Sequence, residues 1–131
     1  MKKNGLLNAE LISEIAAVGH TQYIVISDVG LPVPRGVKVI DLALTPGVPS
    51  FAQVLEAVES ELVSESYILA EEIREKNAGL DRFIGERMGG RAAAYVPHEE
   101  LKKLTREAQV IVRSGETSPY ANIVLVAGVN F

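Results

Sequence analysis

Apolar positions follow two different patterns along this chain. Short unbroken runs rich in β-branched residues are typical of strands that are covered on both faces. Apolar residues that recur every three or four positions are typical of helices with one buried side. The runs predict strands at 23–27, 37–42, 67–70, 92–96, 110–112 and 122–127, and the helical spacing predicts helices at 9–18, 51–62, 77–88 and 98–105.

Turn-forming and capping residues limit several of these elements. Asn8 is expected to cap the first helix, and Gly19 is expected to end it in the left-handed conformation. Ser50 and Gln53 have the spacing of a capping box at the start of the second helix. The alanines at 92–94 fit a helix as well as a strand on propensity alone.

Strands that alternate with helices predict an α/β protein with three layers, α/β/α, in which helices cover both faces of one sheet. The last two strands are joined by a short loop, so we expect them to be antiparallel neighbours in a mixed, mostly parallel sheet. A length of 131 residues without a repeat or linker fits a single domain, 1–131.

Composition narrows the possible functions. A net charge of −4 argues against a nucleic-acid partner, because neutralising phosphates requires a concentrated basic face. The chain has no cysteine, which excludes thiolate nucleophiles and cysteine zinc sites. No stretch approaches the roughly 20 apolar residues of a membrane span, and the amino terminus lacks the apolar run of a signal peptide. We therefore expect a soluble, cytoplasmic protein with no membrane partner.

Titratable side chains lie at the ends of predicted elements. His20 precedes the first strand and Asp28 follows it, while His98 and Lys102 are neighbours at i and i+4 on a helix. A histidine can exchange protons near neutral pH, which suits acid–base catalysis. The alternatives are ordinary: each histidine could be a surface residue or helix cap, Asp28 could form a turn, and Lys102 could be solvated.

The segment 113–122 is denser in hydrogen-bonding groups than a plain turn requires. Tyr120 offers an aromatic face and a hydroxyl, and Asn122 offers a donor and an acceptor together. Such a set suits the hydroxyls and faces of a sugar. The alternative is a loop with local turns, in which Arg113 and Glu116 pair with each other.

Several common chemistries lack their motifs. The chain contains no phosphate-binding glycine loop after a strand, no HExxH cluster and no GxSxG elbow. The two histidines with Asp28 have no spacing specific for a metal, so we expect no metal site. Proton transfer without a cofactor is the simplest remaining chemistry.

Two long motifs carry a resemblance to a known family. They are Gly-His-Thr-x-x-Ile-Val-Ile-x-Asp-x-Gly-Leu-Pro-Val-Pro at 19–34 and Arg-Ser-Gly-Glu-x-Ser-Pro-Tyr-Ala-Asn-Ile at 113–123. Together with shorter matches from the amino terminus to the final Ala-Gly-Val-x-Phe, they resemble the D-ribose pyranases, which are ribose mutarotases related to the L-fucose mutarotases. The resemblance implies a cytoplasmic isomerase that interconverts the pyranose and furanose forms of ribose without a cofactor.

The resemblance also implies roles for individual residues. His20 corresponds to the family's proton donor. The family assembles as a ring-shaped homo-oligomer with its sites between subunits. One departure is Gln22, which stands where the family often has an aspartate, so any role of that carboxylate in orienting the histidine is absent or neutral here. The implied sugar contacts are Asp28, His98, Lys102, Tyr120, Ala121 and Asn122.

A straight strand between His20 and Asp28 would keep the two side chains apart within one subunit. Either the chain bends near His20 or the partner group comes from another copy. Two alternative functions remain at this point: a mutarotase for another sugar such as fucose, and a sugar-binding regulatory or transport-associated module without catalysis.

Overall fold

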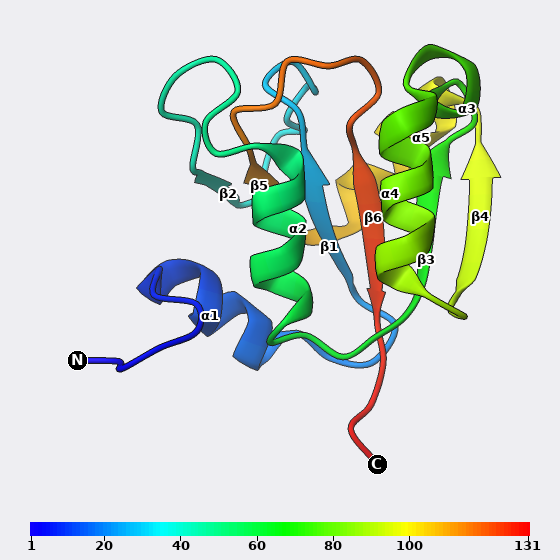
Figure 1. Cartoon of the computed structure of the whole chain (residues 1–131). Coiled ribbons are helices and arrows are strands. Elements are labelled where there is room, and N and C mark those ends of the chain that lie inside the picture. The colour runs from blue at the N-terminus through cyan, green and yellow to red at the C-terminus, as the bar shows by residue number, and fades with distance from the viewer.

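The computed structural model describes residues 1–131 and contains one six-stranded sheet in the order β2-β5-β1-β6-β3-β4 (Figure 1). Strand β6 runs antiparallel to both of its neighbours, whereas all other paired strands are parallel. The predicted mixed, mostly parallel sheet is therefore confirmed. The strands are β1 (Tyr23–Ser27), β2 (Val39–Asp41), β3 (Ser64–Ala70), β4 (Ala92–Val96), β5 (Ala108–Arg113) and β6 (Ile123–Ala127).

The expected pairing of the last two strands is wrong. β5 is hydrogen-bonded to β2 on one edge and to β1 on the other, so it has no free edge for β6. The loop at 114–122 instead carries the chain past the end of β1, and β6 fills the gap between β1 and β3. Loop length alone could not reveal this, because the pairing of β5 depends on strands far away in the sequence.

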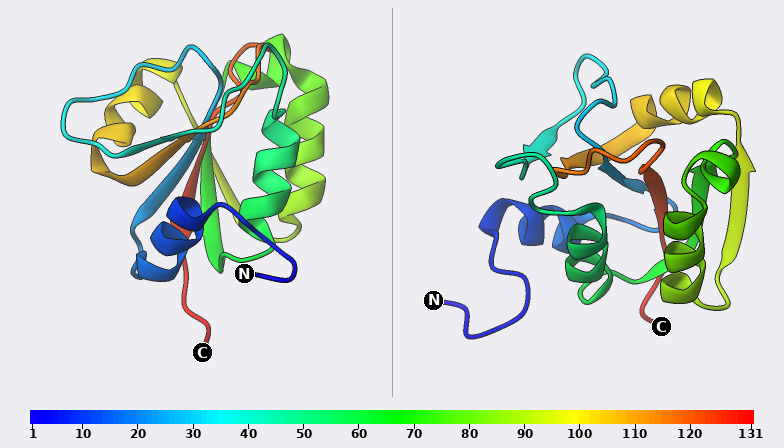
Figure 2. Two further views of the ribbon diagram at one scale, coloured as in Figure 1. Left: turned by 90° about the vertical axis from the view of Figure 1, so that its left-hand side faces the viewer. Right: turned by 45° about the horizontal axis from the view of Figure 1, so that its top comes forward.

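Helices cover both faces of the sheet, which confirms the three-layer prediction. Seen along the sheet, α2 and α4 lie on one side and α5 lies on the other (Figure 2). None of the helices is long and apolar enough to cross a membrane. The helices are α1 (Ala9–Ala17), α2 (Phe51–Glu59), α3 (Ile73–Lys76), α4 (Ala78–Met88) and α5 (His98–Leu104), with a 3-10 turn at Thr105–Glu107.

Strand β1 contributes to the cores on both sides of the sheet. Ile24 and Ile26 join a large cluster with α1, α2 and α4, whereas Val25 joins a smaller cluster with Leu101 of α5. These side chains are fully buried. Burying each one contributes about 1.5–3 kcal/mol, so β1 is a rigid support for the residues at its two ends.

Local hydrogen bonds set the helix ends. The capping box is present: Ser50 Oγ accepts from the Gln53 N–H at 3.1 Å, and the Gln53 side chain accepts from the Ser50 N–H at 2.8 Å. Asn8 caps α1 as expected. The prediction for Gly19 is wrong, because α1 ends at Ala17 through an extended residue and Gly19 does not have a positive φ.

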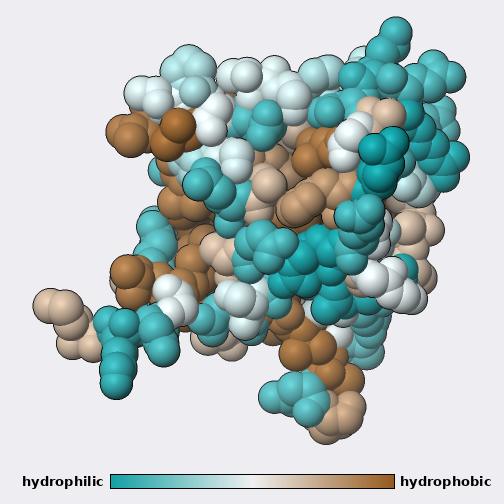
Figure 3. Space-filling view, viewed as in Figure 1, coloured by the Kyte–Doolittle hydropathy of each residue, from teal (hydrophilic) through white to brown (hydrophobic).

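The surface shows apolar side chains at opposite ends of the molecule. One group lies on the loop between β2 and α2, and another lies near the carboxyl terminus (Figure 3). Leu44 and Val48 belong to the first group, and Val63, Val129 and Phe131 belong to the second; all five are exposed.

Candidate functional site

The loops that follow β1, β2 and β5 gather at one edge of the sheet, at the top of Figure 1. These three strands are parallel, so their carboxyl ends lie together. In α/β sheets this edge is the usual location of a binding site, because the strands fix loops whose side chains need not serve the core.

Asp28 directly follows β1 and is held in a fixed orientation. Its Oδ1 accepts hydrogen bonds from the N–H groups of Gly30 and Leu31, both at 2.9 Å. This is the turn-forming role that the sequence left open. Its Oδ2 accepts a hydrogen bond from Asn122 Nδ2 at 3.1 Å, so the turn and the contact with the 114–122 loop coexist.

Asn122 is fully buried and clamps Asp28 from two sides. Besides donating to the carboxylate, its Oδ1 accepts from the backbone N–H of Asp28 at 3.0 Å. Ala121, which precedes it, is also fully buried and packs into the larger core cluster. These two residues therefore fix the loop to the core. They are not exposed themselves, and they act on the site by positioning their neighbours Asp28 and Tyr120.

Tyr120 has a φ of 57°, a left-handed conformation that non-glycine residues seldom adopt. Its ring meets the His98 ring edge-to-face, with centroids 5.1 Å apart and an angle of 81° between the planes. Nδ1 of His98 is buried without a hydrogen-bond partner. A hollow of about 280 Å³ opens here, lined by Asp28, Gly30, Leu31, His98, Pro119 and Tyr120.

Lys102 lies one turn beyond His98 on α5. Its Nζ forms an ion pair with Glu99 at 2.7 Å, and it lines a second hollow beside the loop at 32–34. Because its side chain is partly exposed, the lysine can leave this weak surface pair to meet a ligand.

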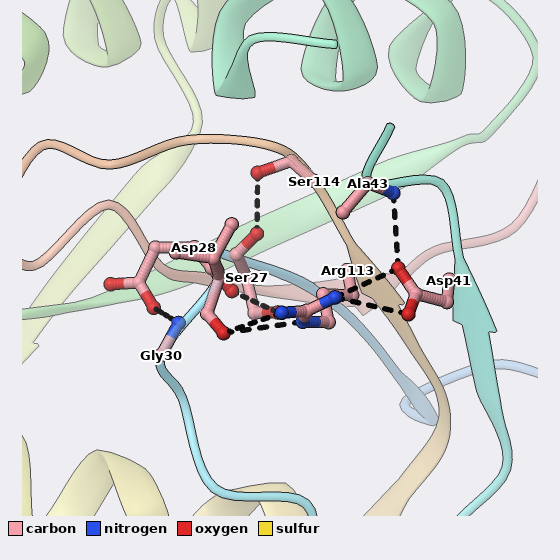
Figure 4. Close-up of polar contacts among 8 residues, drawn as sticks. Ser27, Asp28, Gly30, Asp41, Ala43, Arg113 and Ser114 are labelled. Carbon is pink, nitrogen blue, oxygen red and sulfur yellow. Dashed lines mark hydrogen bonds and ion pairs between the residues drawn. The ribbon is translucent and has the colours of Figure 1, made fainter. Parts of the chain in front are cut away.

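Arg113 and Ser114 form a frame behind Asp28 that sequence reasoning missed (Figure 4). The Arg113 guanidinium donates to the carbonyl oxygen of Val29 at 3.0 and 3.2 Å, and to the Asp41 carboxylate at 3.0 and 3.2 Å. Ser114 Oγ donates to the carbonyl oxygen of Ser27 at 2.6 Å. The end of β1 and the loop after it are thus held by residues at the end of β5, and the Arg113–Asp41 contact ties β5 in turn to β2.

The alternative pairing of Arg113 with Glu116 is wrong. Glu116 instead accepts from the Phe51 N–H at the start of α2 and from the Ser118 N–H and hydroxyl. Burial raises the pKa of Glu116, but these hydrogen bonds outweigh burial, and its pKa lies below the ordinary value. The carboxylate therefore ties the 114–122 loop to α2.

His20 is not part of this cluster. It lies before β1, near the carboxyl end of β6, and lines a hollow with Val63, Gly128 and Phe131. Its Nε2 lies 2.9 Å from Oε2 of Glu65, another contact that the sequence did not predict. The five residues of β1 span roughly 16 Å, so His20 and Asp28 stand at opposite ends of the sheet.

The clustered side chains can position hydroxyl groups and exchange protons. No group of three or more histidine or carboxylate side chains is placed to hold a metal ion. Asp28, His98, Tyr120 and Asn122 are brought together, Lys102 stands beside them, and His20 is separate.

Comparison with known proteins agrees with this fold. D-ribose pyranases of Geobacillus kaustophilus and Laribacter hongkongensis are 50% and 48% identical to the chain, covering 100% of it and 96% and 100% of their own lengths. The structure of Bacillus subtilis RbsD complexed with D-ribose is 44% identical, with a TM-score of 0.97 and complete coverage of both chains.

A fucose mutarotase of Streptococcus pneumoniae, solved in complex with L-fucose, is 24% identical with a TM-score of 0.77, covers 95% of this chain and 94% of its own, and shows a shared fold. The model of the RbsD / FucU transport protein family matches residues 1–130. This chain belongs to the RbsD / FucU transport protein family.

Proposed function

We propose that this protein is a D-ribose pyranase, an isomerase that interconverts the pyranose and furanose forms of ribose. The observation that carries the proposal is the cluster of Asp28, His98 and Tyr120 around one hollow, with the buried Asn122 holding the Asp28 carboxylate. It occurs in a chain that is 44% identical to a protein solved with D-ribose. The proposal includes the cytoplasmic location that the sequence resemblance implies.

The hollow suits a small sugar. One carboxylate, one imidazole and one phenol reach it from three different segments, so hydroxyls pointing in different directions can each find a partner. The Tyr120 ring gives an apolar surface beside them. Lys102 can add a donor after leaving Glu99. These residues would hold the sugar while its ring opens and recloses.

The reaction requires only proton transfers. A proton reaches the ring oxygen as the bond from that oxygen to the anomeric carbon breaks, and the anomeric hydroxyl loses a proton. The open aldehyde then recloses through a different hydroxyl, which gives up its proton while the aldehyde oxygen takes one up. The two transfers of ring opening are thus reversed, and no net proton is consumed. We assign the proton donation to His20. One positioned acid accelerates such a step by about 10²–10⁴-fold.

His20 must reach the sugar from a second copy of the chain, because within one copy it lies at the other end of β1 from the hollow. Contact between two different ends of identical chains is a head-to-tail interface, which closes into a ring when the rotation between successive copies returns to the first copy. The exposed apolar side chains at both ends of the molecule, including Leu44 and Phe131, support such contacts. We therefore propose a ring-shaped homo-oligomer with sites between subunits.

Two other functions give different results in the same experiment. A mutarotase for fucose would accelerate the exchange of L-fucose more than that of ribose. A sugar-binding regulatory module would bind ribose without accelerating exchange. The full-length relatives at about half identity favour ribose, since the fucose mutarotase resembles this chain only in fold.

Saturation-transfer NMR of ribose at equilibrium tests the proposal. Added protein should increase the exchange rate between the pyranose and furanose signals. His20→Ala should remove the increase, and Asn4→Ala, a change at an exposed residue of the amino terminus, should keep it. An unchanged exchange rate with the wild-type protein would refute the enzymatic function.

A further inference from the structure

We propose that Glu65 is a positioning residue for His20 and that it leaves Nδ1 of the histidine as the nitrogen that transfers protons. This inference rests on the proposed role of His20 in ring opening. It begins from the contact between Nε2 of His20 and Oε2 of Glu65 at 2.9 Å. The two residues are 45 positions apart, and both side chains are partly exposed.

A β-bulge directs Glu65 toward the histidine. In the pairing of β3 with β6, Ser64 lies opposite Ala127 and Ser66 lies opposite Val126, so Glu65 is the extra residue between two consecutive partners. A bulge rotates its extra side chain away from the regular alternation of the strand. Here the bulge occurs next to the segment that carries His20.

The neighbouring Gly128 leaves room for this arrangement. A Cβ atom at this position would lie 3.2 Å from the Cβ of Glu65 and 3.4 Å from its backbone nitrogen. The N–H of Gly128 also donates to the carbonyl oxygen of Val63 at 2.8 Å, which holds these two segments of the chain close together. A larger residue here would be tight against Glu65, so the Glu65 backbone would have to shift by a few tenths of an ångström to admit it.

The backbone beside His20 is held by the last residue of β6. Thr21 has a φ of 70°, and its N–H donates to the carbonyl oxygen of Ala127 at 2.8 Å. A left-handed threonine costs about 1–3 kcal/mol, and such strain is concentrated at functional sites. The Gln22 side chain is engaged elsewhere, because its oxygen accepts from the Gly19 N–H at 2.7 Å. Glu65 is therefore the side chain that hydrogen-bonds to the imidazole.

The contact determines which nitrogen of His20 is free. A carboxylate oxygen only accepts hydrogen bonds, so Nε2 must carry the proton that lies between His20 and Glu65. Nδ1 then accepts a proton when the ring is neutral and donates one when the ring is charged. Nδ1 forms no hydrogen bond within the chain, which leaves it available to a sugar held by another copy.

Three variants test the assignment by ribose exchange at varied ribose concentration. Glu65→Ala removes the acceptor and should lower kcat by about 10–100-fold with KM little changed. The magnitude is taken from metalloproteins, in which removing the hydrogen-bond partner of a metal-binding histidine typically costs about 10–100-fold. Glu65→Gln keeps an acceptor oxygen and should retain most of kcat. Glu61→Gln removes an equal charge beside the same hollow, where Glu61 accepts from the Leu6 N–H, and should leave kcat unchanged.

The tautomer of His20 gives a readout that a structural defect would not mimic. In ¹⁵N-labelled protein with a neutral imidazole, Nε2 should carry the proton in the wild type and in Glu65→Gln, and Glu65→Ala should show a mixture of tautomers. An unchanged tautomer or unchanged kcat in Glu65→Ala would overturn the assignment, as would a Glu65→Gln variant as impaired as Glu65→Ala. If the wild type fails to exchange ribose, the proposed function fails, while the tautomer still tests the contact.

Discussion

Two substitutions at Asn122 distinguish the contributions of its two hydrogen bonds to Asp28. Asn122→Ala removes the donor to the Asp28 carboxylate and the acceptor for the Asp28 N–H. Asn122→Asp has almost the same shape and keeps the acceptor. It replaces the amide donor with a carboxylate oxygen about 3.1 Å from the Asp28 carboxylate, the distance that now separates donor and acceptor.

The expected losses of stability follow from these contacts. A hydrogen bond to a charged group contributes about 1.5–3 kcal/mol and a neutral one about 0.5–1.5 kcal/mol, so Asn122→Ala should lower the free energy of unfolding by about 2–4 kcal/mol. In Asn122→Asp the two charges repel by up to about 5 kcal/mol at an effective dielectric constant of about 20. At neutral pH the nearly isosteric variant should therefore be destabilised at least as strongly as the alanine variant.

Urea unfolding followed by circular dichroism measures these differences. All variants are compared at one protein concentration, because assembly contributes to the apparent stability. Asn4→Ala, at an exposed position, is the control and should be neutral. An Asn122→Asp variant as stable as the wild type would show that the amide does not hold the Asp28 carboxylate in this orientation.

Three other changes give distinct results. Glu116 has a lowered pKa when folded, so its contribution is present above its ordinary value of 4.5 and is lost as pH falls through the folded pKa. In urea unfolding, the free energies of unfolding of wild type and Glu116→Gln should therefore differ by about 1–2 kcal/mol at pH 7 and converge in acid. A difference that does not change with pH would show that the ionised Glu116 carboxylate is not its source. Ser50→Ala should cost about 1 kcal/mol in the same assay, and no loss would mean that the capping box does not stabilise α2. Tyr120→Phe keeps the edge-to-face contact with His98 and should raise KM in ribose exchange, whereas an unchanged KM would show that the hydroxyl does not bind the sugar.

Much of the fold is visible in local patterns. The run at 23–27 and the capping box at Ser50 form as predicted, because their signals lie in neighbouring residues. The strand at 92–96 also forms, although its alanines fit a helix equally well, and it pairs with β3. The position of β6 was missed because it depends on which strand edges remain free once β5 has paired with β2 and β1.

The candidate site was only partly predictable, for the same reason. Asp28 lies where a loop follows a buried strand, so its place at the sheet edge follows from sequence. Its contact with Asn122 joins positions 94 apart, and the Arg113 contact with Asp41 joins positions 72 apart, so both depend on strand order. Glu65 gave no signal, because a bulge shifts the alternation that would indicate its direction.

Mixing two inactive variants tests most directly whether the site is shared between copies. His20→Ala and Asp28→Ala each remove one half of the proposed site. Assembled together in equal amounts, they should recover about a quarter of the wild-type ribose exchange per site, because each half is intact in about half of the copies. Replacing the Asp28→Ala partner with the double variant His20→Ala/Asp28→Ala should abolish the recovery.

A site within one chain gives the opposite result. Every copy in the first mixture would carry one defect, so exchange would stay at the level of the separate variants. Recovery to about a quarter of wild-type exchange, absent with the double variant, is the predicted result. Mixed assemblies of the two variants that form normally but show no recovery would contradict a site built from His20 of one copy and Asp28 of another.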